Sequence, residues 1–201
     1  MIIDDTTYKL GDNNYYKVEN RKTQIVIGHT SRKDMYHFSS WVNRHNGKYK
    51  KTAAFTIDTD GKIYQHFNPK YYSDYIDIHN MGPFTIPVVL TNIGWLERDT
   101  LNDRYYDWLG HSYIFDSGEV VKEKWRNRDY WVRYSNEQLK SLRELTDYLC
   151  NEFKINNNCI SHTMFNEDVD IYEGITFKSN YYQESTDVNP SFDMNIFKTT
   201  V

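Results

Sequence analysis

The sequence predicts an α/β (α+β) domain, with a mixed central β-sheet flanked by helices. Two observations favour this class. Short β-branched or apolar runs alternate with segments whose apolar residues recur at helical spacing. The length of 201 residues is that of one domain. We therefore expect a single domain over residues 1–201, with a polar N-terminal arm at 1–22.

The composition excludes several classes of protein. The longest apolar runs, such as residues 86–90, are far shorter than the roughly 18 residues that cross a bilayer, so we expect a soluble protein without a membrane span. The net charge of −4 argues against a nucleic-acid partner. Acidic residues in the opening MIIDDTTYKLGDN, with no long apolar run after them, predict that there is no signal peptide.

The first strand and helix are predicted from residue patterns near the N-terminus. Residues 23–27 (TQIVI) form a β-branched run that ends at Gly28-His29, which is typical of a buried strand presenting a histidine at its C-terminal end. Residues 34–46 then carry apolar residues at helical spacing and stop at Asn46-Gly47, as a helix C-terminus does.

The next strands surround a tight turn. Residues 52–57 and 62–67 flank Asp-Thr-Asp-Gly, which predicts a β-hairpin. Residues 84–93 (FTIPVVLTNI) form another apolar strand, and Pro87 within it predicts a bulge or a gap in the hydrogen-bond ladder.

The second half contains an insertion, a helix and a long tail. Residues 94–133 are rich in aromatic residues and predict an inserted sub-structure with a hairpin at 113–121. Leucines at helical spacing predict a helix over 135–153 with Ser135 as N-cap. Residues 159–161 suggest a brief strand before His162, and the tail after it reads as irregular.

Three side chains could form a metal site. His29, His162 and Asp187 provide two imidazoles and one carboxylate, a common set of ligands for catalytic zinc that leaves a fourth position open for water. With seven histidines in the chain, spacing alone supports this set only weakly.

The order of several motifs strengthens this interpretation. TQIVIGHT, AAFTIDTDGKIYQHF, DIHNMG, a Ser-x-x-Gln helix, SH and TDVNPSF follow one another in the chain. This order resembles the zinc-dependent N-acetylmuramoyl-L-alanine amidases, a superfamily that includes phage amidases and the peptidoglycan recognition proteins. The resemblance implies that Zn²⁺ is held by His29, His162 and Asp187 at the floor of a groove.

The sequence also departs from the family pattern. Ala53 and Ala54 replace a tyrosine and a histidine of many relatives, Val89 stands where some carry a catalytic glutamate, and Ser185 replaces a lysine. The usual general base is therefore not visible.

The resemblance leaves the catalytic roles open. Ser185 is the candidate for a hydrogen bond to the developing oxyanion. The proton carrier is expected to be a carboxylate or a tyrosine from the insertion or the long loop. The candidates include three glutamates that the sequence does not rank, Glu97, Glu173 and Glu184.

Substrate contacts are expected from two further segments. His79 matches a groove-lining position of the family, although a surface histidine in a polar loop is as good an interpretation. Residues 163–186 form a long loop over the site, in which Tyr181 and Tyr182 could wall the groove or could simply cover the sheet. His37, His45, His66 and His111 are expected to be structural or solvated.

The expected activity is hydrolysis of the amide between N-acetylmuramic acid and L-alanine in peptidoglycan. We expect a monomeric phage lysin or virion-associated wall hydrolase, located in the host cytoplasm or the virion. The alternatives are a non-catalytic peptidoglycan-binding protein of the same fold and a structural phage component.

Overall fold

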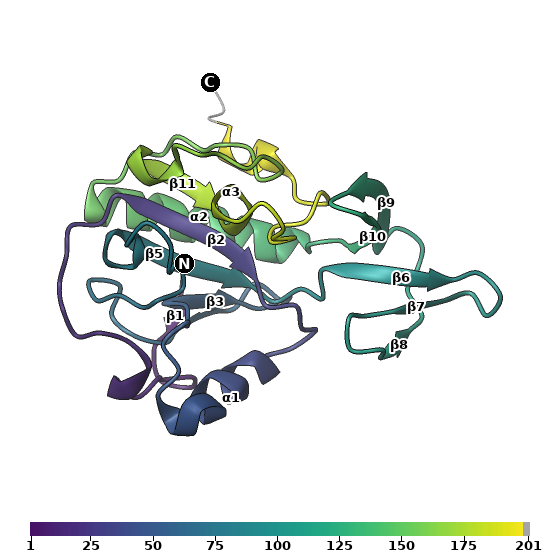
Figure 1. Cartoon of the computed structure of the whole chain (residues 1–201), viewed down its shortest axis with the longest axis horizontal. Coiled ribbons are helices and arrows are strands. Elements are labelled where there is room, and N and C mark those ends of the chain that lie inside the picture. Colours follow the sequence, from purple (N-terminus) through teal and green to yellow (C-terminus); the bar gives the residue numbers. More distant parts are fainter. Residues whose placement is uncertain (199–201) are drawn as a thin grey trace.

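The computed structural model describes residues 1–198 and contains two β-sheets (Figure 1). The central sheet has six strands in the order β1-β4-β3-β5-β2-β11 and is mixed, because only β3 and β4 pair antiparallel. Its strands are β1 (Ile3–Asp4), β2 (Gln24–His29), β3 (Phe55–Ile57), β4 (Ile63–Gln65), β5 (Thr85–Leu90) and β11 (Gly174–Phe177). The predicted fold class is confirmed.

Strands β2 and β5 form the centre of this sheet. Every residue of both strands is buried, since helices or loops cover both faces, and this explains their nearly continuous apolar sequences. Pro87 lies in β5 opposite Val26 without a shift of register, so the predicted bulge is wrong. The carbonyl of Pro87 accepts a hydrogen bond from Ala54 N, just before β3 begins, so this residue's backbone polar groups face β3. The N–H that proline lacks would point the same way, and its absence therefore costs no hydrogen bond to β2.

Two longer helices pack against the central sheet, and Figure 1 shows them on opposite sides of β3. The first, α1 (Tyr36–Asn43), continues into a 3-10 turn at Arg44–Gly47. The second, α2 (Asn136–Phe153), is the helix that the leucine pattern predicted, and its N-cap Ser135 accepts from Gln138 N at 3.0 Å. No helix within residues 1–198 is long and apolar enough to span a bilayer.

The insertion forms a sheet of its own that projects from the body of the molecule (Figure 1). Its strands lie in the order β8-β7-β6-β10-β9, and the expected hairpin at 113–121 is wrong, because β8 and β9 form opposite edges. Each edge strand pairs with a different neighbour. The strands are β6 (Trp95–Asp99), β7 (Arg104–Tyr106), β8 (Ser112–Tyr113), β9 (Val120–Trp125) and β10 (Arg128–Val132).

Three segments are more ordered or less ordered than expected. The N-terminal arm contributes β1, which pairs parallel with β4. Residues 159–161 make only an isolated bridge, between Cys159 and Ile175. The tail that reads as irregular contains β11 and the short helix α3 (Lys178–Tyr181). The remaining 3-10 helices are Asp12–Asn14, Gly82–Phe84, Val169–Ile171 and Met194–Phe197.

Two buried histidines connect α1 to the sheet. His37 Nε2 and His66 Nε2 lie 3.1 and 2.7 Å from the Thr56 hydroxyl, and His66 Nδ1 lies 2.7 Å from the carbonyl of Tyr8. Burial lowers the pKa of His37 to about 4 and that of His66 to about 3. Both imidazoles are therefore neutral in the folded protein at neutral pH.

This pair predicts a loss of stability in mild acid. Because both folded-state pKa values lie below the ordinary value of 6.5, the unfolded chain takes up protons first as the pH falls. We expect the free energy of unfolding, measured by urea denaturation, to fall by about 2 kcal/mol per histidine between pH 6.5 and pH 5. A His66→Gln variant should depend less on pH in this window; a wild-type stability that is flat there would contradict the assignment.

Candidate functional site

The candidate site lies where β2 ends, at the carboxyl edge of the parallel strands, which is where α/β sheets usually bind ligands. His29 is the last residue of β2, and its imidazole is buried. Its Nδ1 lies 3.0 Å from the Tyr134 hydroxyl. When Nδ1 carries the proton and donates to Tyr134, the lone pair of Nε2 is free to bind a metal.

Asp187 faces His29 from the C-terminal part of the chain. Asp187 Oδ1 lies 3.1 Å from His29 Nε2, and Asp187 Oδ2 lies 3.2 Å from Lys178 Nζ. Burial by itself would raise the pKa of this carboxyl, but His29 and Lys178 hold it well below its ordinary range. Asp187 is therefore an ionised carboxylate in a buried site.

The contact between His29 and Asp187 fits two ligands of one metal ion. His29 Nε2 is buried and makes no hydrogen bond, in spite of its short distance to the carboxylate. Two ligands bound to zinc at tetrahedral angles lie about 3.3 Å apart, which is close to this separation. A nitrogen and a carboxylate oxygen are both donors that zinc accepts.

His162 has two unpaired ring nitrogens. Both are buried without a hydrogen-bond partner among the described residues, and the ring packs against Phe177 and Phe192 at centroid distances of 5.7 and 5.5 Å. Burial lowers its pKa to about 4, so the imidazole is neutral at neutral pH, as a metal ligand must be. Leaving such atoms unpaired costs about 1–3 kcal/mol, which metal binding would offset.

The backbone holds His162 and Asp187 in fixed relation. Ser179 Oγ donates to the carbonyl of His162, and Ser179 N donates to the carbonyl of Asp187 at 2.7 Å. The structure thus brings His29 and Asp187 together and connects the backbone of His162 to that of Asp187. Over residues 1–198, however, no three His, Cys, Asp or Glu side chains are already close enough to form a complete metal-binding group.

Two residues that the sequence did not single out also belong to this site. Lys178 and Tyr75 line a pocket of about 220 Å³ together with Tyr182. The Tyr75 hydroxyl is buried without a hydrogen-bond partner, and burial raises its pKa. It lies against the backbone of Gly28, where any Cβ would collide with it. Nothing local in the sequence marks these two residues, because only the fold brings them to Asp187.

The other residues expected at the site differ in burial and in their distance from the pocket. Tyr182 lines the pocket, and its hydroxyl donates to Asp77. Tyr181 does not form a wall of the groove: it is buried and its hydroxyl bonds to a side chain of β2. Ser185 Oγ accepts from Asp187 N at 3.2 Å, Glu184 is exposed, and His79 lies on the surface with Nδ1 3.4 Å from Asp170 Oδ2.

The two remaining candidate carboxylates form ion pairs with arginines. Glu97 pairs with Arg128 at 3.0 Å and Glu173 with Arg21 at 2.9 Å, both on the surface. Neither glutamate lines the pocket beside Asp187.

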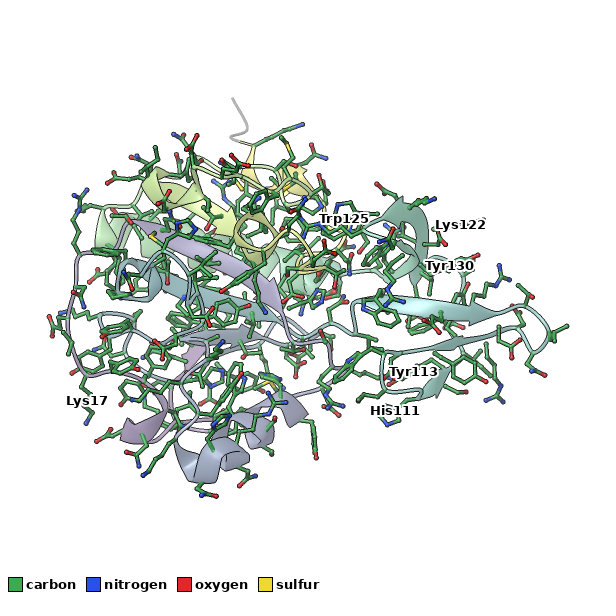
Figure 2. The ribbon with its side chains drawn as sticks, in the orientation of Figure 1. Lys17, His111, Tyr113, Lys122, Trp125 and Tyr130 are labelled. Atoms are coloured by element: carbon green, nitrogen blue, oxygen red, sulfur yellow. The ribbon has the colours of Figure 1, made fainter. Side chains whose placement is uncertain are left out.

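Two neighbouring residues of the insertion, Trp125 and Arg126, form hydrogen bonds to the long loop. Arg126 lies in the turn between β9 and β10, and its guanidinium donates to the carbonyls of Ser179, Tyr182 and Ser185. Next to it, Trp125 Nε1 donates to the carbonyl of Thr163 at 3.2 Å, and Figure 2 shows Trp125 where the hairpin meets the body. This contact supports the segment that leads to Asp187.

The turn itself explains how Arg126 reaches the loop. Arg126 and Asn127 both have positive φ, 46° and 61°, as the two central residues of a tight hairpin turn of type I′ do. Asparagine adopts this left-handed conformation readily. For arginine the conformation costs some free energy, which the three hydrogen bonds of Arg126 to carbonyls offset.

Comparison of solved structures defines the class of fold. N-acetylmuramoyl-L-alanine amidase LysC from Clostridium intestinale URNW superposes with a TM-score of 0.52 at 12% identity, covering 98% of this chain and 95% of that one. The Ph2119 endolysin from Thermus scotoductus MAT2119 bacteriophage Ph2119 gives 0.50 at 12% identity, with coverages of 93% and 91%. The protein therefore has the amidase fold.

The sequence then identifies the family. The model of the N-acetylmuramoyl-L-alanine amidase family matches residues 19–178, which include His29 and His162. The chain belongs to this family, and the expected family and enzyme class are confirmed. No curated protein matches the sequence.

The arginine contact gives a test of how the insertion supports the site. Arg126→Ala removes three charge-assisted hydrogen bonds to partly buried carbonyls and should lower the free energy of unfolding by about 2–4 kcal/mol. Hydrogen exchange should also become faster in residues 178–187. Arg128→Ala, on the same hairpin, removes a surface ion pair with Glu97 and the stacking of the guanidinium on Trp95, but no bond to the long loop. As the matched control it should change stability by about 1 kcal/mol and leave hydrogen exchange in residues 178–187 as in the wild type. Equal effects of the two variants would contradict this role.

Proposed function

We propose that this amidase is zinc-dependent and that His29, His162 and Asp187 hold the metal. The observation that carries the proposal is the buried, ionised carboxylate of Asp187 beside the unpaired Nε2 of His29. His162 adds two further unpaired nitrogens in the same region. The set of two imidazoles and one carboxylate suits zinc.

The proposed reaction is hydrolysis of the amide between N-acetylmuramic acid and L-alanine. When bound, Zn²⁺ would act as a Lewis acid toward the amide carbonyl and would lower the pKa of water. Tyr134 orients the His29 ring through its hydroxyl, as outer residues commonly do for metal ligands. Ser185 acts through Asp187, because its hydroxyl accepts from the Asp187 N–H.

Lys178 is the cation available to the reacting amide. Its ammonium lies 3.2 Å from Asp187 Oδ2 and lines the same pocket as Tyr75 and Tyr182. A positive charge held at the edge of the pocket would stabilise the negative charge that develops on the carbonyl oxygen. We therefore assign the stabilisation of the oxyanion to Lys178 instead of Ser185.

Tyr75 is the best placed group for carrying a proton. Its side chain lines the pocket, and its buried hydroxyl has no partner among the described residues and lies beside Gly28, next to His29. Glu184, by contrast, is exposed and does not line this pocket. We therefore favour Tyr75 over Glu184 for this role.

The biological setting that we propose is lysis of a host cell wall by a phage. The fold is shared with structures described as endolysins, including the Ph2119 endolysin. The peptidoglycan strand or a muropeptide is then the substrate. A peptidoglycan-binding protein without activity is the alternative, and it predicts binding of muropeptides without release of an L-alanine-terminated peptide.

Metal content tests the ligand set. Wild-type protein should carry about one zinc per chain by elemental analysis, and His162→Ala should lose most of it together with release of peptide from muropeptides. His45→Ala, which changes an exposed histidine that is expected to be structural or solvated, is the control and should keep both. A His162→Ala variant with full zinc content would exclude His162 as a ligand.

The role of Lys178 can be separated from metal binding. Lys178→Met should lower kcat about 10²–10³-fold, as the loss of an oxyanion-stabilising group does, while the zinc content stays unchanged. Lys51→Met removes another lysine of the same pocket, which is paired with Asp77, and should leave kcat within a few-fold of wild type. The role would be wrong if both variants kept the wild-type kcat.

A further inference from the structure

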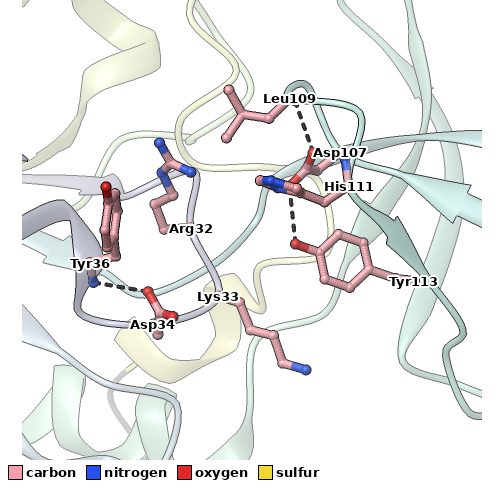
Figure 3. Close-up of a pocket in the computed structure, with 8 residues that line it drawn as sticks. All are labelled: Arg32, Lys33, Asp34, Tyr36, Asp107, Leu109, His111 and Tyr113. Carbon is pink, nitrogen blue, oxygen red and sulfur yellow. Dashed lines mark hydrogen bonds and ion pairs between the residues drawn. The ribbon is translucent and has the colours of Figure 1, made fainter.

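A second pocket lies between the body and the insertion, at the carboxyl edge of β2. It has a volume of about 460 Å³ (Figure 3). Four residues that follow His29 line one side of it, and the segment between β7 and β8 lines the other. We call it the insertion pocket. The lining residues that matter below are Arg32, Lys33, Asp34, Tyr36, Asp107 and Tyr113.

An exposed tyrosine lines the insertion pocket, and an exposed tryptophan lies near it on the other side of Arg32. Tyr36 is 61% exposed and Trp108, beside the pocket, is 46% exposed. The guanidinium of Arg32 lies over both rings, 5.3 and 5.4 Å from their centroids. Trp108 Nε1 also donates to the carbonyl of Ser31 at 3.0 Å, which fixes the insertion against the body. The aromatic surface is therefore held in place before any ligand binds.

The polar groups of the insertion pocket offer both donors and acceptors. Within residues 1–198, the side chains of Arg32 and Lys33 have neither an ion pair nor a hydrogen bond. The carboxylate of Asp34 accepts, among the described residues, only from Tyr36 N. Asp107, in contrast, is saturated by the N–H groups of two neighbouring residues and by the hydroxyl of Tyr113. Unused donors and an unused carboxylate oxygen thus face one space.

This combination fits a saccharide better than other ligands. A simple anion would meet the carboxylates of Asp34 and Asp107, and an apolar ligand would remove the charges of Arg32 and Lys33 from water without compensation. A sugar ring presents an apolar C–H face to aromatic side chains, and its hydroxyls both donate and accept.

The insertion pocket adjoins a second pocket and lies close to His29 in the chain. It shares Lys33 and Tyr113 with a neighbouring pocket of about 580 Å³. Its own lining begins at Arg32, three residues after His29 at the end of β2. A polymeric ligand whose amide is bound near His29 is therefore long enough to reach the insertion pocket.

We propose that the insertion pocket is a subsite for the glycan strand of peptidoglycan, which contacts the ring of Tyr36 and the side chains of Arg32 and Asp34. This inference rests on the proposed function, because the glycan strand carries the amide that the enzyme cleaves. The insertion thus selects polymeric wall over small muropeptides.

Binding of peptide-free glycan strands tests the inference without any hydrolysis. The probe is glycan from which another amidase has removed the peptides, titrated by calorimetry against the full chain. Tyr36→Ala should weaken binding about tenfold, since it removes an exposed aromatic contact. Tyr148→Ala, which removes a 44% exposed tyrosine on α2 outside these pockets, should bind as the wild type does.

A second variant and a second readout distinguish failure of the subsite from failure of the proposed function. Arg32→Met, with folding checked by its thermal midpoint, should also weaken glycan binding, and both pocket variants should lose activity on polymeric wall more than on a single muropeptide. Absence of glycan binding by the wild type, or equal binding by all variants, overturns the subsite even when the amide is hydrolysed. Glycan binding without any hydrolysis would instead overturn the proposed function.

Discussion

The buried carboxylate of Asp187 is the group around which the site is organised. An ionised carboxylate away from water is costly unless positive or hydrogen-bonding partners surround it. His29 arrives from the end of a central strand, Lys178 from a short helix, and the N–H of Asp187 itself is capped by Ser185. Lys178 and Ser185 precede Asp187 closely in the chain, whereas His29 comes from β2 near the other end of it. The carboxylate therefore makes the site depend on how the C-terminal segment packs against the central sheet.

The sequence predicted those features that depend on local pattern. The helix α2 follows from leucine spacing and the Ser135 cap, and the hairpin of β3 and β4 from its turn. Strand β11 was hidden because four residues carry too little periodicity, and the hairpin at 113–121 was wrong because β8 and β9 pair with other strands.

The same limit applies to the site residues: those that only tertiary contacts define could not be predicted from the sequence. The resemblance singled out His29 and Asp187, which the fold brings into contact, whereas Lys178 and Tyr75 have meaning only through tertiary neighbours. Tyr181 shows the reverse error: its partner in β2 lies far away in sequence, so nothing nearby indicates that it is buried. A tyrosine in a polar tail can thus be either core or surface.

The two-residue turn at Arg126 has a consequence for how the family can vary. Loops normally tolerate inserted residues because they lie on the surface. In this hairpin an added residue would change the turn type and swing the guanidinium away from three carbonyls of another segment. The length of the β9–β10 turn is therefore coupled to the conformation of the chain before Asp187, so these two stretches should change in evolution only together.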